Sequence, residues 1–135
     1  MKQFEFQNEI IDSRLQFFLG DVRDYQRLLQ IMRGVDFVIH AAAMKQIPAS
    51  EINPIEAIKT NIIGAENIVS ASIQFGIKKI IALSTDKAAN PANLYGATKL
   101  AIDHMITAEA ATHGISAASL RYFNVAGALK AERGW

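Results

Sequence analysis

Four short apolar runs alternate along this chain with longer stretches of helical periodicity, and this order restricts the possible folds more than any other feature. The runs cover residues 15–19, 35–40, 80–84 and 117–122. In DFVIH and KKIIALS consecutive residues are apolar, which is typical of strands in a parallel sheet covered on both faces. Because strands that alternate with helices favour a parallel sheet with right-handed crossovers, we predict an α/β fold with a doubly wound parallel sheet.

The stretches between the runs carry their apolar residues on one helical face. Within residues 54–75 these positions step by three or four, which traces a single stripe along a helix. Pro54 suits the first turn of that helix, and Gly76 suits its end. A shorter helix is predicted over residues 22–33 and a third over residues 94–112. Each predicted helix therefore connects two predicted strands.

One expected part of a dinucleotide-binding sheet is missing. Such a sheet usually opens with a strand, a glycine-rich turn and a helix whose N-terminus binds the pyrophosphate. The eight glycines of this chain are scattered and form no such turn, and residues 1–10 have helical character. We therefore expect residues 1–135 to form a partial Rossmann-like domain that lacks the first strand and the glycine-rich turn, with the substrate lobe absent.

Composition excludes several classes of function. The net charge of +1 gives no support for a nucleic-acid partner or an anionic membrane, and no apolar run is long enough to span a bilayer. The chain has no cysteine, so disulfides and thiolate metal sites are excluded. Its histidines lack the spacing of a metal site; we expect a structural role for His40 and surface positions for His104 and His113. The expectation is a cytoplasmic protein with no metal.

The candidate chemistry lies in one short segment. Tyr95 and Lys99 are four residues apart, so they share one face of a helix. An ammonium group near a phenol favours the phenolate, and such a pair can take a proton from an alcohol near neutral pH, as hydride transfer to a nicotinamide requires. Just upstream, Thr85, Asp86 and Lys87 place an acid beside a possible base. The segment therefore holds two sets of proton-transfer groups.

These candidates all follow predicted strands. Asp21 follows the first run, residues 41–45 the second, residues 85–87 the third and Asn124 the fourth. In open parallel sheets, ligands bind beyond the carboxyl ends of the strands, so we expect these residues to meet at one edge. For Asp21, capping of the following helix is an alternative to ligand contact.

Four stretches carry a resemblance to a known family. They are GDVRD at residues 20–24, VDFVIHAAAMKQIP at 35–48, NPIEAIKTNIIGAENI at 53–68 and IALSTDKAANPANLYGATK at 81–99. On these stretches the chain resembles the extended short-chain dehydrogenase/reductases, and within them the UDP-N-acetylglucosamine 4,6-dehydratases of bacterial polysaccharide biosynthesis. Tyr-x-x-x-Lys alone is a weak pattern, whereas the whole string from residue 84 to residue 99 is specific to these dehydratases.

The resemblance implies a bound NAD or NADP, with weak or absent binding here because the phosphate-binding turn is missing. Asp21 and Val22 would line the adenine pocket, and three alanines would pass close under the cofactor. Asn61 would support the wall beside the nicotinamide. The implied cofactor-binding set is Asp21, Val22, Ala41, Ala42, Ala43, Asn61, Ser84, Tyr95 and Lys99.

The resemblance also implies catalytic roles. Tyr95 would deprotonate the sugar 4-hydroxyl while hydride leaves for the cofactor, and Lys99 would hold the nicotinamide ribose. Lys87 would then remove a proton from the carbon next to the new ketone. Asp86 would protonate the departing 6-hydroxyl, and Thr85 would hydrogen-bond the 4-oxygen. The cofactor then returns its hydride, so no net redox change occurs.

The implied substrate is a nucleotide sugar, with Lys45 and Asn124 as its contacts. In similar proteins the helices that match residues 54–75 and 94–112 pair with their copies, so we expect a homo-oligomer. Two alternatives stay open. The tail SLRYFNVAGA, residues 119–128, resembles UDP-sugar 4-epimerases, and the chain could also be a non-catalytic folded fragment that forms an oligomer.

Overall fold

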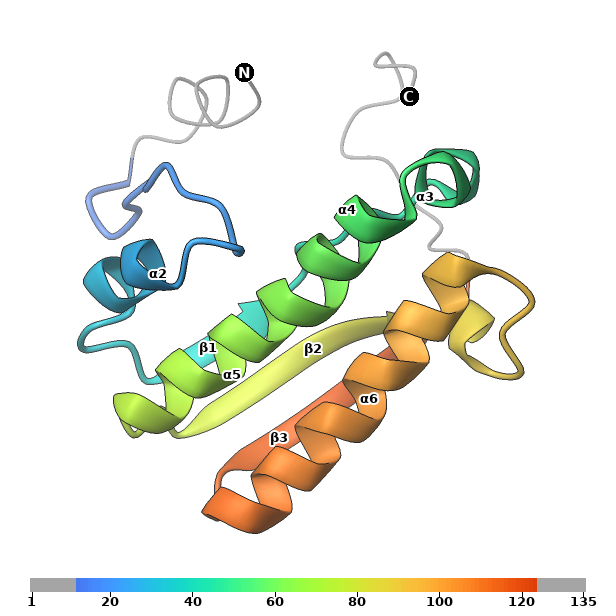
Figure 1. Cartoon of the computed structure of the whole chain (residues 1–135). Helices are drawn as coiled ribbons and strands as arrows, with labels where there is room; N and C mark the ends of the chain where they lie inside the picture. The colour runs from blue at the N-terminus through green and yellow to red at the C-terminus, as the bar shows by residue number, and fades with distance from the viewer. Residues whose placement is uncertain (1–11, 124–135) are drawn as a thin grey trace.

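The computed structural model describes residues 12–123 and has a three-stranded parallel sheet at its centre (Figure 1). The strands are β1 (Phe37–His40), β2 (Lys79–Thr85) and β3 (Ser116–Tyr122), in the order β1-β2-β3. In the register, Val38 lies opposite Ile80, and Leu83 lies opposite Leu120. The α/β class and the parallel sheet predicted from the alternation of elements are therefore confirmed.

The predicted helices are present, with small changes at their ends. The helices are α2 (Tyr25–Ile31), α3 (Ile47–Ile52), α4 (Pro54–Ile58), α5 (Gly64–Gln74) and α6 (Leu94–His113), together with a π-helical turn, η1 (Lys59–Ile63), and a 3₁₀ turn, η2 (Asp86–Ala88). The stretch predicted as one helix over residues 54–75 is built from α4, η1 and α5 without a break. The sequence patterns did not predict α3.

Polar caps define where two of these helices begin. The Asp24 carboxylate accepts a hydrogen bond from the backbone N–H of Arg27, so α2 begins at Tyr25 rather than at Val22. The Asn93 side chain accepts one from the N–H of Gly96 at the start of α6. Asp24, not Asp21, therefore caps α2, and the alternative role considered for Asp21 is wrong.

One predicted strand does not form within residues 12–123. Residues 15–19 have no strand geometry, and Leu15, Phe18 and Leu19 are exposed. A strand forms only where a neighbouring strand accepts its backbone hydrogen bonds. In a dinucleotide-binding sheet with the strand order 3-2-1-4-5-6, the third strand pairs with the second. If residues 15–19 correspond to that third strand, residues 12–123 contain no second strand to pair with them. An apolar run alone was not sufficient.

The helices α5 and α6 pack side by side on one face of the sheet (Figure 1). The strand residues on that face, Val38, Ile80 and Ala82, pack with Ala65 and Ile102 of the two helices. On the opposite face Phe37, Ile39 and Leu120 are exposed, the first two by 66% and 70%. The described helices therefore bury one face of the sheet.

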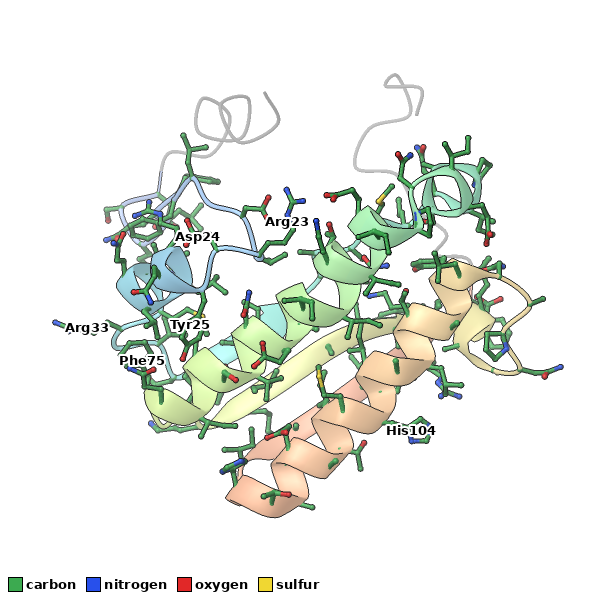
Figure 2. The ribbon with its side chains drawn as sticks, in the orientation of Figure 1. Arg23, Asp24, Tyr25, Arg33, Phe75 and His104 are labelled. Atoms are coloured by element: carbon green, nitrogen blue, oxygen red, sulfur yellow. The ribbon has the colours of Figure 1, made fainter. Side chains whose placement is uncertain are left out.

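A second core forms where α2 meets α5. Leu28 of α2 and Met32, its C-cap residue, pack with Ile68 and Ala71 of α5. Tyr25 and Phe75 lie at the border of this cluster (Figure 2). The Tyr25 hydroxyl donates a hydrogen bond of 2.9 Å to the Gln74 side chain. The two cores pack α5 against both α2 and the sheet. They therefore also hold α4 and η1, which precede α5 without a break, in position.

Candidate functional site

An open cleft of about 500 Å³ lies at the carboxyl edge of the sheet. Its walls come from the segment after β1, the end of β2, the turn η2, the start of α6 and the end of β3. The predicted site residues that line it are Ala41, Ala43, Lys45, Ser84, Thr85, Lys87, Tyr95 and Lys99. The structure therefore brings Tyr95 and Lys99 to the same cleft as Thr85 and Lys87, whereas Asp86 does not line it.

Lys99 lies at the back of the cleft and is 3% exposed. Its Nζ donates a 2.7 Å hydrogen bond to the carbonyl oxygen of Leu83, near the end of β2. Burial lowers the pKa of Lys99, and the negative charge of Asp103 opposes this effect. The half-buried Tyr95, one helical turn earlier on α6, lines the same cleft. The two residues therefore share a helix face, as the spacing predicted, and the structure directs that face at the cleft.

The turn η2 holds the second proton-transfer set in a small network. The Thr85 hydroxyl donates 2.9 Å to Asp86 Oδ1 and lies 3.3 Å from the backbone nitrogen of Lys87, from which it accepts a hydrogen bond. Lys87 Nζ lies 3.4 Å from Asp86 Oδ1. The Thr85 hydroxyl and then Lys87 lower the pKa of Asp86 below its usual value. In this arrangement Asp86 is a carboxylate near neutral pH, beside a lysine at the rim of the cleft.

Gly96 lets α6 approach this turn. A Cβ atom at position 96 would lie 2.2 Å from the carbonyl oxygen of Lys87, too close for any side chain. The first turn of α6 and the turn η2 therefore touch through bare backbone. This contact brings Tyr95 and Lys87 to the same cleft, and no side chain other than hydrogen fits there.

Asn61 does not line the cleft but braces its wall. It is fully buried in η1, and its amide donates to the carbonyl oxygen of Met44 and to Thr98 Oγ while accepting 2.7 Å from the backbone N–H of Met44. These bonds connect the segment after β1 to α6. Single π-helical turns inside α-helices are frequent at functional sites. Asn61 therefore joins the two segments, and its role beside a nicotinamide stays a prediction.

Several predicted cofactor contacts lie away from the cleft. Asp21 forms a 2.7 Å ion pair with Arg23, whose other nitrogen reaches Glu56, and Figure 2 shows Arg23 extended toward α4. Val22 packs against Gly64, and its carbonyl accepts from Asn67. Ala42 is exposed and does not line the cleft. Asn124 lies outside the described residues.

His40 ends β1 behind the cleft and is 4% exposed. Its Nε2 has no hydrogen-bond partner within residues 12–123. Burial and then the charge of Lys99 lower the pKa of His40 to about 4, so the imidazole is neutral at ordinary pH. The buried, structural position expected of His40 is confirmed, and His104 lies exposed on the outer side of α6 (Figure 2).

Sequence reasoning missed a buried carboxylate close to the site. Asp103 accepts hydrogen bonds from Ser84, Ser119 and Arg121, which lie on β2 and β3. Its signal was available, because Asp103 is four residues after Lys99 and eight after Tyr95, and so it continues their stripe on α6. Tyr122 and Phe123, which also line the cleft, were not predicted to do so.

Two features are absent from the described part of the chain. Residues 12–123 contain no group of three or more His, Cys, Asp or Glu residues that could hold a metal ion. Among the same residues no helix is both long and apolar enough to cross a membrane.

Comparisons with known proteins agree with this geometry. A UDP-N-acetylglucosamine 4,6-dehydratase (inverting) from Campylobacter jejuni is 58% identical over 108 residues, covering 80% of this chain and 32% of the relative. A UDP-glucose 4-epimerase from Rickettsia prowazekii is 47% identical over 109 residues, covering 81% and 32%. The solved UDP-glucose 4-epimerase from Brucella ovis in complex with NAD superposes with a TM-score of 0.77 at 29% identity, covering 81% of this chain and 38% of that one.

The chain spans about a third of the length of the curated relatives it matches. The resemblance to the dehydratases is confirmed by the Campylobacter jejuni relative, and the Rossmann-like fold by the superposition. The polysaccharide biosynthesis protein family matches residues 1–129, nearly the whole chain. This chain therefore belongs to the polysaccharide biosynthesis protein family.

Proposed function

We propose that this chain carries the catalytic segment of a cytoplasmic nucleotide-sugar 4,6-dehydratase, which converts UDP-N-acetylglucosamine into a 4-keto-6-deoxy sugar nucleotide. The observation that carries the proposal is the convergence of Tyr95, Lys99, Thr85 and Lys87 on one cleft. The 58% identity with the Campylobacter jejuni dehydratase supports the choice of reaction.

The residues present fit a nicotinamide cofactor. Ala41 and Ala43 line the cleft with small side chains, which leaves space for a flat ring system. Lys99 Nζ has three donors, of which one is used on Leu83, so others remain for the hydroxyls of a ribose. When bound, NAD or NADP accepts the hydride of the sugar carbon and later returns it. We expect weak binding by this chain alone, because no glycine-rich turn offers its backbone N–H groups to the pyrophosphate.

The side chains divide the proton transfers between them. Tyr95 takes the proton of the 4-hydroxyl, and the Lys99 ammonium stabilises the phenolate that starts this step. The Thr85 hydroxyl has a single donor hydrogen, so it turns from Asp86 Oδ1 to hydrogen-bond the 4-oxygen when the sugar binds. Lys45 contacts the sugar nucleotide from the segment after β1, and Asn124 is the corresponding contact from the tail.

Elimination needs a neutral Lys87 as base and a protonated Asp86 as acid. Lys87 Nζ lies 3.4 Å from Asp86 Oδ1, so a proton of the ammonium can pass to the carboxylate. Moving that proton across the contact creates the reactive pair with no proton taken from water. A bound sugar nucleotide displaces water from the rim, and desolvation favours the neutral form of both groups. Lys87 then removes the proton next to the ketone, and Asp86 protonates the leaving hydroxyl.

The test is a chimaera in which this chain replaces the matching segment of the Campylobacter jejuni dehydratase. We expect it to form a 4-keto-6-deoxy product from UDP-N-acetylglucosamine, detected by mass spectrometry. The matched control is Tyr95→Phe, which keeps the ring and removes the proton acceptor. A folded chimaera that binds cofactor and forms no such product would contradict the proposal.

A UDP-sugar 4-epimerase is the second candidate, favoured by the 47% identity with the Rickettsia prowazekii protein. Epimerisation uses Tyr95 and Lys99 but needs no elimination, so it does not require Lys87. Lys87→Ala in the chimaera discriminates the two: it abolishes dehydration and leaves epimerisation of UDP-glucose unchanged.

A homo-oligomer through residues 54–75 and 94–112 remains part of the proposal, either for an active enzyme or for a non-catalytic fragment. An interface through these helices needs exposed apolar residues. Ile63, which is 46% exposed, and Ala101, which is exposed, meet this need, whereas Ile106 is buried in the core and does not. Sedimentation velocity tests the surface: Ile63→Lys is expected to give a smaller species than the unchanged chain. The control is Gln26→Lys, at an exposed position on α2 outside the two helical stretches. Identical sedimentation of Ile63→Lys and the unchanged chain would exclude this interface.

A further inference from the structure

The polar stripe of α6 continues beyond the two residues already discussed. Tyr95, Lys99 and Asp103 follow one another at steps of four, on the face of α6 directed at the sheet edge. Asp103 is 8% exposed, and a buried carboxylate is costly unless it is well hydrogen-bonded. The Asp103 carboxylate accepts hydrogen bonds from the Ser84 hydroxyl at 3.0 Å, from the Ser119 hydroxyl, and from Arg121 Nε at 2.8 Å.

We propose that Asp103 is a positioning residue whose carboxylate keeps the buried Lys99 in its ammonium form, so that Lys99 can stabilise the Tyr95 phenolate. The inference deepens the proposed function and rests on it for the catalytic consequence. The electrostatic part, the effect of Asp103 on Lys99, is a property of this chain and is measured without substrate or cofactor.

The surroundings of Lys99 make this support necessary. The ammonium is almost fully buried and has one protein hydrogen bond, so desolvation favours the neutral amine. From β1, His40 faces it as a neutral imidazole and supplies no negative charge. From η2, the carboxylate of Asp86 is partly exposed to solvent and is paired with Lys87. Asp103 is thus the buried carboxylate one turn along α6 from Lys99, where residues four apart are neighbours, and its charge opposes the desolvation.

The partners of Asp103 hold this charge in place. Ser84 belongs to the last residues of β2, while Ser119 and Arg121 belong to β3, so the carboxylate is fixed against both strands. Arg121 is the charged partner, and its side chain is 44% exposed. Because Arg121 is partly solvated, its charge is screened more strongly than that of the buried Asp103, and Asp103 still opposes the desolvation of Lys99.

A purely structural role for Asp103 predicts the opposite sign for a mutation. If Asp103 only joined α6 to the strands, its loss would loosen the packing and admit water to Lys99. Hydration of the ammonium would raise the pKa of Lys99 toward its usual value. If Asp103 acts through its charge, its replacement by asparagine lowers the pKa of Lys99, because asparagine keeps an acceptor oxygen and the size but not the charge.

The experiment is a pH titration of this chain by NMR, following the Lys99 side-chain signal in selectively labelled protein. The Asp103→Asn variant is expected to titrate at lower pH than the unchanged chain, and Asp103→Glu to restore the original value. The matched control is Glu109→Gln, which removes the same charge from α6 at a site paired with His113 and ten residues from Lys99. At about 15 Å along the helix, beyond the screening length of about 10 Å, it should leave Lys99 unchanged. An unchanged or raised pKa in Asp103→Asn would overturn the inference.

A second variant decides the question if Asp103→Asn does not fold, as judged from its amide spectrum. Arg121→Gln removes the cation that shares the Asp103 carboxylate, so the pKa of Lys99 is expected to rise; an unchanged or lowered value overturns the inference. Failure of the proposed function gives a different signature. A shifted Lys99 in a chain whose completed chimaera forms no dehydration product would leave the electrostatic inference intact and remove only its catalytic consequence.

Discussion

Two lysines lie beside carboxylates at the same edge of this sheet, and they differ mainly in burial. Lys99 is 3% exposed and near a buried Asp103, whereas Lys87 and Asp86 have side chains that are 42% and 34% exposed. In the buried pair the protein holds both charges in place with hydrogen bonds from two strands. In the exposed pair water stabilises both charges, so the proton can move once a ligand removes that water. The same two residue types thus suit a fixed charge in one place and a movable proton in the other.

The largest expected effect is on the rate of catalysis, because the two lysines act in different steps of the proposed reaction. In the chimaera, Lys99→Met should slow hydride removal from the sugar, whereas Lys87→Met should allow it and block elimination. Loss of a general base or acid typically costs about 10²–10⁴-fold in rate. Absorbance of the reduced nicotinamide separates the cases: it should accumulate with Lys87→Met and not with Lys99→Met. Accumulation in both variants would break the comparison.

The second prediction uses His40, the neutral neighbour of the buried lysine. Its pKa is lowered from 6.5 to about 4 in the folded chain. The unfolded chain therefore binds more protons below pH 6.5, and stability is lost as the pH falls from about 6.5 to about 4. A shift of this size corresponds to roughly 3 kcal/mol. Urea unfolding at a series of pH values measures the loss.

The control for that measurement is His104, which is exposed on α6. His104→Gln should keep the acid-dependent loss of stability, and His40→Leu should remove most of it. A steep loss below pH 6.5 that survives in His40→Leu would assign the effect to other groups.

Removing each carboxylate tests the structural side of the comparison. Asp103→Asn should lower the free energy of unfolding by about 1–3 kcal/mol, because it leaves buried donors without their charged acceptor. Asp86→Asn should leave the unfolding midpoint unchanged, since exposed ion pairs contribute little. Chemical unfolding followed by circular dichroism gives both values. Equal destabilisation by the two variants would show that burial does not distinguish the pairs.

The smallest expected effect concerns the exposed pair alone. The Thr85 hydroxyl is the main cause of the lowered pKa of Asp86. Thr85→Val removes this donor at nearly constant volume, so the pKa of Asp86 should rise toward 3.8 while Lys99 titrates as before. Carboxyl carbon NMR follows Asp86 directly. A pKa for Asp86 unchanged by Thr85→Val would indicate that Lys87 alone sets it.

The accuracy of the sequence-based predictions depended on the range of the interactions involved. The helix over residues 54–75 and the Tyr95–Lys99 stripe depend on contacts between residues three or four apart, and both were predicted correctly. A strand at residues 15–19 would need a partner strand from a distant part of the chain, and the prediction of that strand was wrong. The cleft position of Thr85 and Lys87 was predictable because parallel strands end at a common edge.

The sequence by itself determined the alternation of strands and helices, the parallel sheet and the spacing of Tyr95 and Lys99, because each of these follows from local periodicity. Only the tertiary structure decided that Lys99 is buried, that Asp103 lies between Ser84 and Arg121, and that Asp21 pairs with Arg23 away from the cleft. The physical reason is that the protonation state of a side chain depends on desolvation and on charges from other strands and helices. Those distances are set by packing and not by spacing along the chain.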